Sequence, residues 1–150
     1  MDVFIVYSLK DRKNLFNVKE ILISLGYNPI ILDEIAPTGT IFEKLTSTAS
    51  KCEKAIVIYS GIDCGGLYKN NKANVSLKRR ARENVVFELG LFIGLLKIQN
   101  VLILLNNNIE RSSLPSDLAG IETKSLNVNK KTLKKNIKMF LERQTIWKKY

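Results

Sequence analysis

Apolar runs and amphipathic segments alternate along this chain. Four short runs of hydrophobic residues are typical of strands buried on both faces, namely residues 3–7, 29–32, 55–59 and 101–105. Helical spacing of apolar residues predicts helices over 14–25, from a Thr40 cap through Leu45, from Ala81 or Asn84 to Lys97, and in the basic tail, 130–150. A short fifth strand is predicted within 123–128, and long loops over 61–76 and 106–116.

Strands that alternate with helices predict an α/β fold with a parallel sheet covered on both faces. Five strands favour a flavodoxin-like three-layer sandwich of strand order 2-1-3-4-5. Ligands of such sheets bind beyond the carboxyl ends of the strands. In this chain those ends are residues 8–11, 33–39, 60–66 and 106–117.

The composition narrows the possible chemistry. With 150 residues, 45% of them hydrophobic and 25% charged, the chain fits one globular domain. It contains no histidine, which excludes histidine-ligated metals and Ser–His or Cys–His nucleophiles. Cys52 and Cys64 are too few for a metal site or a disulfide scaffold, so we expect free thiols and a cytoplasmic location. We expect no membrane partner, because the most apolar stretch, residues 85–96, is shorter than the ~20 residues of a membrane span.

The net charge of +10 is concentrated in two segments. Residues 69–82 hold six basic and no acidic residues, and residues 130–150 hold eight basic residues and one acidic residue. The tail is typical of a surface helix with a solvated lysine face, and nucleic-acid binding is a weaker alternative without a supporting motif. The run of basic residues at 78–82 is either a solvated loop or a phosphate-binding element.

Glu88 is the most informative residue, because it lies within an otherwise apolar helix that we expect to be buried. A buried carboxylate is unfavourable unless it is paired, hydrogen-bonded or open to a cleft. Its predicted place near the helix start also favours an anion. Two interpretations remain open: an ion pair with Arg80 or Arg82, or a catalytic carboxylate in a cleft. The glycine-rich nucleotide loops GxGxxG and GxxxxGK[ST] are absent from the sequence.

Several segments together carry a resemblance to a known family. The most specific is residues 80–90, Arg-Ala-Arg-Glu-Asn-Val-Val-Phe-Glu-Leu-Gly; weaker matches are residues 4–6, 25–32, 39–44, 55–58, 92–94 and 114–121. In this order the chain resembles the bacterial TIR-like domains of predicted nucleotide-binding proteins, among them the TIR domains joined to STING domains in antiphage defence. Departures from the family pattern are Tyr7-Ser8 in place of His-Gly, and a single acid, Asp63, in place of two.

The resemblance implies a TIR fold and a function. It implies hydrolysis of NAD to nicotinamide and ADP-ribose, with Glu88 as the catalytic glutamate and NAD as substrate, without a cofactor or metal. It implies self-association into oligomers or filaments, and a fused or partner STING domain that senses a cyclic dinucleotide. It also places further residues around the nucleotide, namely Ser8, Lys10, Asp11, Gly39, Thr40, Asp63, Arg80, Arg82, Asn84 and Asp117.

The chemistry of NAD agrees with a site that has one carboxylate and no histidine. Glycoside hydrolases usually need a second carboxylate to protonate the leaving group. Nicotinamide leaves NAD from a cationic ring and departs neutral, so no acid is required. The alternatives are a non-catalytic TIR interaction module, a sensor that binds a nucleotide intact, and an enzyme like the nucleoside deoxyribosyltransferases.

Overall fold

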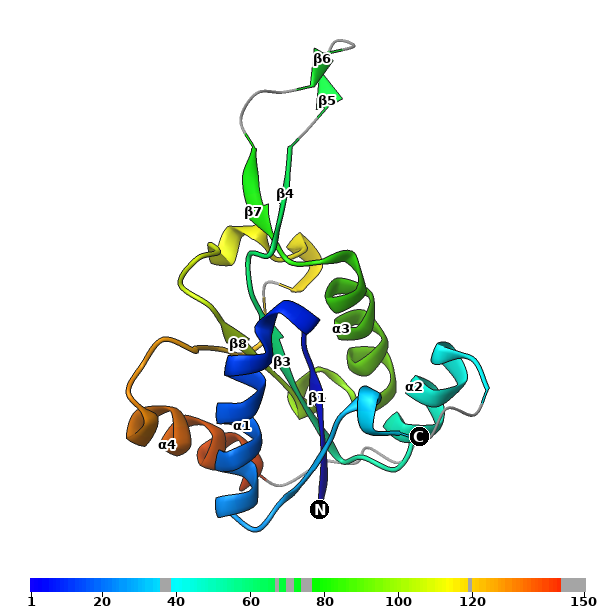
Figure 1. The fold of residues 1–150 in the computed structure, drawn as a ribbon, viewed down its shortest axis with the longest axis vertical. Helices are drawn as coiled ribbons and strands as arrows, with labels where there is room; N and C mark the ends of the chain where they lie inside the picture. Colours follow the sequence, from blue (N-terminus) through cyan, green and yellow to red (C-terminus); the bar gives the residue numbers. More distant parts are fainter. Residues whose placement is uncertain (36–38, 67, 70–71, 74–76, 119, 144–150) are drawn as a thin grey trace.

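The computed structural model describes residues 1–35, 39–66, 68–69, 72–73, 77–118 and 120–143. The main helices are α1 (Arg12–Ser24), α2 (Ile41–Ala49), α3 (Glu83–Leu96) and α4 (Lys130–Leu141) (Figure 1). The main strands are β1 (Asp2–Val6), β2 (Asn28–Ile30), β3 (Lys54–Tyr59), β8 (Val101–Leu105) and β9 (Thr123–Ser125). Short 3-10 turns at 9–11, 32–34, 98–100, 111–113 and 116–118 join these elements.

The five main strands form one parallel sheet in the order β2-β1-β3-β8-β9. The predicted parallel α/β sheet is therefore confirmed. The order 2-1-3-4-5 holds when only the strands of this sheet are counted. It does not hold for the full set of strands, because β4–β7 are inserted between β3 and β8.

Both faces of the sheet are buried, as the continuous apolar strands predicted. Val3 and Ile5 of β1 pack with α1 and α4, whereas Phe4 and Val6 point to the opposite face, toward α2 and α3. The ring of Phe4 stacks on that of Phe92 in α3, with centroids 4.4 Å apart. The two pairs of helices lie on opposite sides of the sheet (Figure 1).

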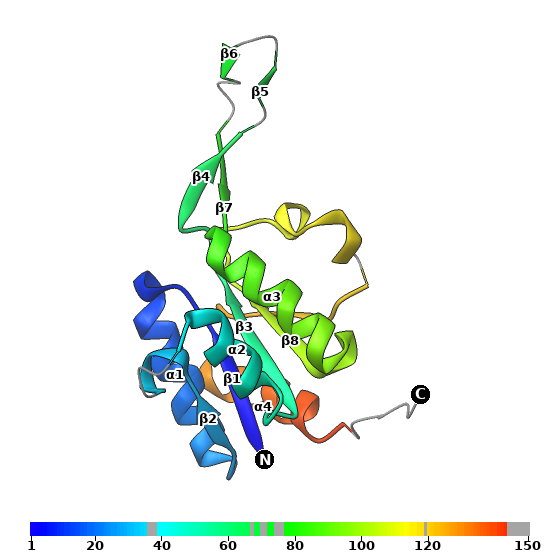
Figure 2. The ribbon, with the colours of Figure 1, turned by 90° about the vertical axis from the view of Figure 1, so that its right-hand side faces the viewer.

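The long loop predicted for residues 61–76 is wrong. Strand β4 (Asp63–Gly65) pairs antiparallel with β7 (Lys78–Arg80), and β5 (Tyr68–Lys69) pairs with β6 (Lys72–Ala73). Together they form an arm that projects from the carboxyl end of the sheet (Figure 2). The sequence signal was missed because these strands are two or three residues long and lack an apolar alternation.

Helix α3 is buried on one face only, which corrects the expectation that its apolar sequence would be covered all round. Val85, Leu89, Phe92 and Leu96 are buried against the sheet, and Phe87 is 55% exposed. Gly90, Gly94 and Leu95 are exposed as well. The ring of Phe42 from α2 lies 6.4 Å from that of Phe87, and both remain open to solvent.

The ends of the chain segment also differ from prediction. The basic tail helix ends at Leu141, and the last seven residues lie outside the described part of the structure. The fifth strand covers only Thr123–Ser125. Within the described residues, no helix reaches the length and hydropathy that a membrane span needs.

Candidate active site

A cavity of about 400 Å³ opens where β1 and β2 end and α3 begins. A volume of this size suits a small ligand. Its wall comes from four parts of the chain: the end of β1 and the turn after it, the 3-10 turn after β2, the first residue of α2, and the N-terminal half of α3. The lining residues are Ile5, Tyr7, Ser8, Leu9, Leu32, Asp33, Ile41, Arg82, Asn84, Val85 and Glu88.

Glu88 presents one of the two carboxylates of this cavity, and Asp33 presents the other. The helix dipole favours an anion most strongly in the first turn of a helix. Glu88 is the sixth residue of α3, so it lies beyond that turn. Among the described residues, no hydrogen-bond donor or cation pairs with it. Desolvation, and secondarily the negative charge of Asp33, raise the pKa of Glu88 to about 7. The carboxyl group therefore changes protonation near neutral pH.

The structure does not show the ion pair between Glu88 and Arg80 or Arg82 that was one interpretation of the sequence. Arg80 pairs with Glu83 at 3.6 Å, and Arg82 pairs with Asp63, also at 3.6 Å. Neither arginine is paired with Glu88. Both ion pairs are solvent-exposed, so each contributes little to stability.

Tyr7 and Asp33 are site residues that the sequence reasoning missed. The Tyr7 hydroxyl donates a hydrogen bond to Oδ2 of Asp33, and both side chains line the cavity with Glu88. Burial and this hydrogen bond raise the pKa of Tyr7 to about 12, so the phenol stays a donor at neutral pH. The available signal was their place in the chain, because both residues follow strands whose carboxyl ends border the cavity.

The cavity unites some of the residues that the family resemblance indicated. Ser8, Arg82 and Asn84 line it together with Glu88. Asp63 reaches the group through its ion pair with Arg82. The other predicted residues do not line it: they are Lys10, Asp11, Gly39, Thr40, Arg80 and Asp117.

Four of these residues have other surroundings. Asp11 is buried, accepts a hydrogen bond from Asn14 at 2.8 Å through Oδ1, and has no partner for Oδ2 within the described part of the chain. The side chain of Arg80 lies against Gly65 in the β4–β7 arm, and Arg80 lines a separate hollow together with Tyr59 and Phe87. Asp117 belongs to an exposed 3-10 turn. Lys10 is also exposed, in the turn that Ser8 caps.

Gly39 and Thr40 shape the edge of the cavity indirectly. Thr40 caps α2 as predicted: its hydroxyl accepts from the Glu43 amide at 3.2 Å, and the Glu43 carboxylate accepts from the Thr40 amide at 2.7 Å. Gly39 has a φ of +73°, and a Cβ there would lie 2.7 Å from the Glu43 carboxylate. This cap fixes the start of α2, which places Ile41 in the cavity wall.

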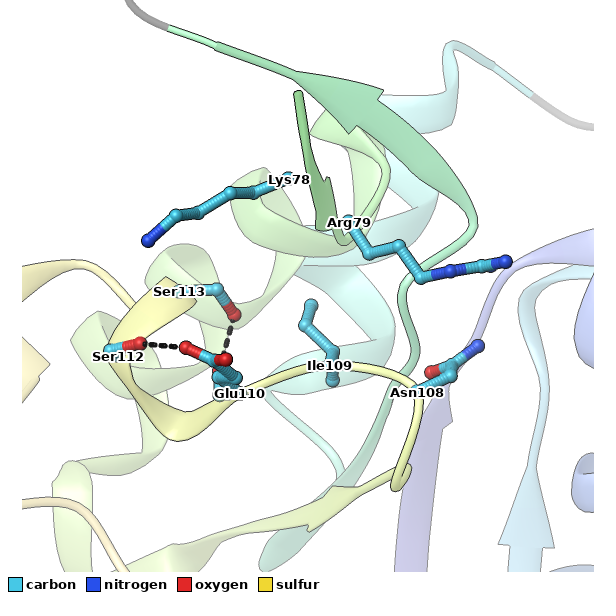
Figure 3. Close-up of a pocket in the computed structure, with 7 residues that line it drawn as sticks. All are labelled: Lys78, Arg79, Asn108, Ile109, Glu110, Ser112 and Ser113. Carbon is cyan, nitrogen blue, oxygen red and sulfur yellow. Dashed lines mark hydrogen bonds between the residues drawn. The ribbon is translucent and has the colours of Figure 1, made fainter. Parts of the chain in front are cut away.

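A second hollow, of about 360 Å³, lies between β7 and the loop after β8 (Figure 3). Lys78 and Arg79 line it, and Arg79 donates to the Gly61 carbonyl at 3.2 Å. Its only carboxylate, Glu110, accepts a hydrogen bond from Ser112 at 2.9 Å. The Glu88 cavity is therefore the stronger candidate for catalysis, because the Glu88 carboxylate has no such donor among the described residues.

The described part of the chain offers no set of residues that could bind a metal ion. No three acidic or cysteine residues gather there as ligands. Both cysteines are free; Cys52 is buried, and burial raises its pKa to about 11, whereas Cys64 is exposed in β4.

One solved structure supports the fold, and a second matches it less well. Clostridium botulinum CMP N-glycosidase BcmB superposes with a TM-score of 0.59 at 11% identity, covering 93% of this chain and 99% of that one. The 2-deoxyribosyltransferase of Bacillus psychrosaccharolyticus superposes with a TM-score of 0.43 at 13% identity, over 70% of this chain and 72% of that one.

Sequence comparison gives the family. Escherichia coli K12 protein YuaY, described as uncharacterized, is 38% identical over 121 residues, which are 79% of this chain. The chain spans only 38% of the length of YuaY. The model of the CAP12/Pycsar effector protein TIR domain matches residues 2–128, a range that holds the whole cavity wall. The chain therefore belongs to the TIR domain family of CAP12/Pycsar effector proteins.

Proposed function

We propose that this domain hydrolyses NAD to nicotinamide and ADP-ribose, with Glu88 as the catalytic residue. The observation that carries the proposal is the Glu88 carboxylate in the cavity wall, without a hydrogen-bond donor among the described residues. A carboxylate left free in this way is available to a substrate. Cleavage of an N-glycosidic bond is also the reaction named for the CMP N-glycosidase that shares this fold.

The roles follow from charge. As the C1′–N bond of NAD breaks, positive charge moves from the nicotinamide ring to the ribose. An ionised Glu88 stabilises the ribosyl cation that develops. Nicotinamide leaves neutral and needs no proton. Water then adds to C1′ and gives up a proton, which the Glu88 carboxylate accepts and passes to solvent. Ser8 and Asn84 supply hydrogen bonds to ribose hydroxyls, and Arg82 supplies a cation for the pyrophosphate.

The test is nicotinamide release from NAD by the wild-type domain and by Glu88→Gln. We expect Glu88→Gln to lower the rate about 10³-fold, because the substitution removes the negative charge and keeps the shape. The matched control is Glu142→Gln, which neutralises an exposed glutamate that follows α4 and lies outside the cavity. Equal rates for wild type and Glu88→Gln would overturn the proposal.

We also propose that self-association activates the domain. Ile41 and Phe42 of α2 and Phe87 and Leu95 of α3 are exposed apolar side chains. Burying them between copies would be favourable. The activity per molecule is then expected to rise with protein concentration. A STING domain that binds a cyclic dinucleotide, fused or as a partner, would trigger this assembly as part of an antiphage defence.

A non-catalytic interaction module is the second candidate, and the same exposed apolar side chains favour it. The two candidates differ in one result. Clustering the domain on an oligomeric carrier releases nicotinamide if the domain is an enzyme. If it is only an interaction module, clustering gives association without loss of NAD.

A further inference from the structure

Asp33 brings a second carboxylate into the Glu88 cavity. It belongs to the 3-10 turn Leu32–Glu34, which follows β2, and it lines the cavity with Glu88. The hydrogen bond from the Tyr7 hydroxyl fixes Asp33 as an acceptor. The hydrogen bond between Tyr7 and Asp33 therefore joins the segments that follow β1 and β2, two neighbouring strands, and holds the Asp33 carboxylate at the cavity. Helix α3 supplies the other carboxylate, that of Glu88.

The charged groups around Glu88 favour its protonated form. The titratable or charged side chains in the cavity wall are Tyr7, Asp33 and Arg82. Tyr7 is neutral and occupied by Asp33, and Arg82 is paired with Asp63. Desolvation is the larger cause that raises the pKa of Glu88 to about 7, and the charge of Asp33 is the smaller one. The site therefore exists in two protonation states at neutral pH.

We propose that Asp33 and Glu88 form a two-carboxylate site in which protonated Glu88 donates its proton to a departing nucleobase, so that the domain also cleaves 5′-nucleotides of neutral bases. This inference rests on the proposed function, because it uses the same cavity and the same glutamate. Paired carboxylates, one protonated and one charged, are the usual arrangement for cleaving a glycosidic bond whose leaving group needs a proton.

The step balances without a further reactant. The C1′–N bond breaks and its electron pair stays on the base, which takes the proton from the Glu88 carboxyl group. The resulting Glu88 carboxylate faces the ribosyl cation. Water adds to C1′ and gives its proton to Glu88, which restores the protonated form. The products are the free base and ribose 5-phosphate. Asp33 acts through Glu88 and is a positioning residue.

Two substrates of similar size separate the protonation states. Nicotinamide mononucleotide and cytidine 5′-monophosphate both join a six-membered ring to ribose 5-phosphate through a ring nitrogen, but only the first ring is cationic. Nicotinamide and cytosine release are measured with the wild-type domain, clustered on an oligomeric carrier, from pH 5.5 to 8.5. We expect nicotinamide release to rise to a plateau above pH 7, and cytosine release to fall about tenfold for each pH unit above 7.

Each outcome decides something. Nicotinamide release without cytosine release at any pH overturns the two-carboxylate inference and leaves the proposed function standing. Cytosine release that rises with pH also overturns the inference. Release of neither base overturns the inference, and nicotinamide release from NAD under the same conditions then decides separately whether the proposed function stands. Opposite pH dependences for the two products support both.

Asp33→Asn tests the positioning role, because it removes the charge and keeps the size. We expect the midpoints of both pH profiles to move to lower pH, and cytosine release at pH 7 to fall severalfold, because a charge that raises the pKa of Glu88 is removed. A merely structural role would lower both rates without moving the midpoints. The control is Glu34→Gln, which neutralises the adjacent exposed carboxylate and should leave the midpoints in place. Unmoved midpoints in Asp33→Asn would overturn the inference.

Discussion

Lys54 and Glu88 are charged side chains with opposite surroundings, the first buried and the second half-buried. Lys54, at the start of β3, is 1% exposed. Its ammonium group donates to three carbonyl oxygens at the end of α4, those of Phe140 at 2.7 Å, Leu141 at 3.1 Å and Arg143 at 2.8 Å. The same group lies 4.9 Å from the centre of the Phe140 ring. These carbonyls have no partner within the helix, and the negative end of the helix dipole favours a cation.

Glu88 lacks all of these compensations. No donor among the described residues reaches its carboxylate, and the charge that contributes to its raised pKa, that of Asp33, has the same sign. The comparison teaches that burial of a charge does not by itself identify a functional residue. Lys54 holds α4 to the sheet, because all its donors are used. The Glu88 carboxylate has no compensating partner among the described residues, which is the situation expected of a group that meets a ligand.

The largest effect is expected at Lys54, whose charge is compensated by three hydrogen bonds. Lys54→Met leaves the last carbonyls of α4 without a donor and removes a buried charged hydrogen-bond network. We expect the free energy of unfolding to fall by about 3 kcal/mol, measured by urea denaturation. Lys51→Met, at an exposed position three residues before β3, is the control and is expected to change the free energy of unfolding by less than about 0.5 kcal/mol. Equal losses in the two variants would contradict a structural role for Lys54.

An intermediate effect of opposite sign is expected for Glu88→Gln. In the folded protein the pKa of Glu88 is about 7, above the ordinary value of 4.5, so the carboxyl group stays protonated to a higher pH than in the unfolded chain. The wild type therefore loses stability as the pH rises from 4.5 through 7, and the variant does not. We expect Glu88→Gln to be more stable by roughly 2 kcal/mol at pH 8, after allowance for solvent near the carboxylate, and equal to wild type at pH 4.5. Urea denaturation at both pH values measures this; a difference that does not depend on pH would speak against it.

The smallest effect concerns the hydrogen bond between Tyr7 and Asp33. Tyr7→Phe removes one hydrogen bond from a partly exposed pair, so we expect a loss of about 1 kcal/mol or less, seen as a fall in Tm of about 2–4 °C. The control is Tyr27→Phe, whose hydroxyl makes no hydrogen bond within the described residues. A larger loss than that of Lys54→Met would mean that the Tyr7–Asp33 pair is part of the structural framework.

Most of the fold was predictable because it depends on local pattern. The continuous apolar runs fixed β1, β3 and β8, and the Thr40–Glu43 spacing fixed the start of α2. The arm formed by β4–β7 was not predictable, since its strands are short and polar. Glu88 was also identified from the sequence, because a carboxylate inside an apolar helix is conspicuous at any fold.

The sequence by itself determined the α/β class and the parallel sheet, and it singled out Glu88 as the candidate residue, since each follows from hydrophobic periodicity or from the transfer cost of one charge. Only the tertiary structure decided which groups face that charge. Tyr7, Asp33 and Glu88 come from three separate elements, and nothing in their local sequence relates them. The same holds for Lys54 and the end of α4, which are 86 residues apart. Electrostatic interactions depend on distance in space, and the packing of the sheet and helices sets that distance.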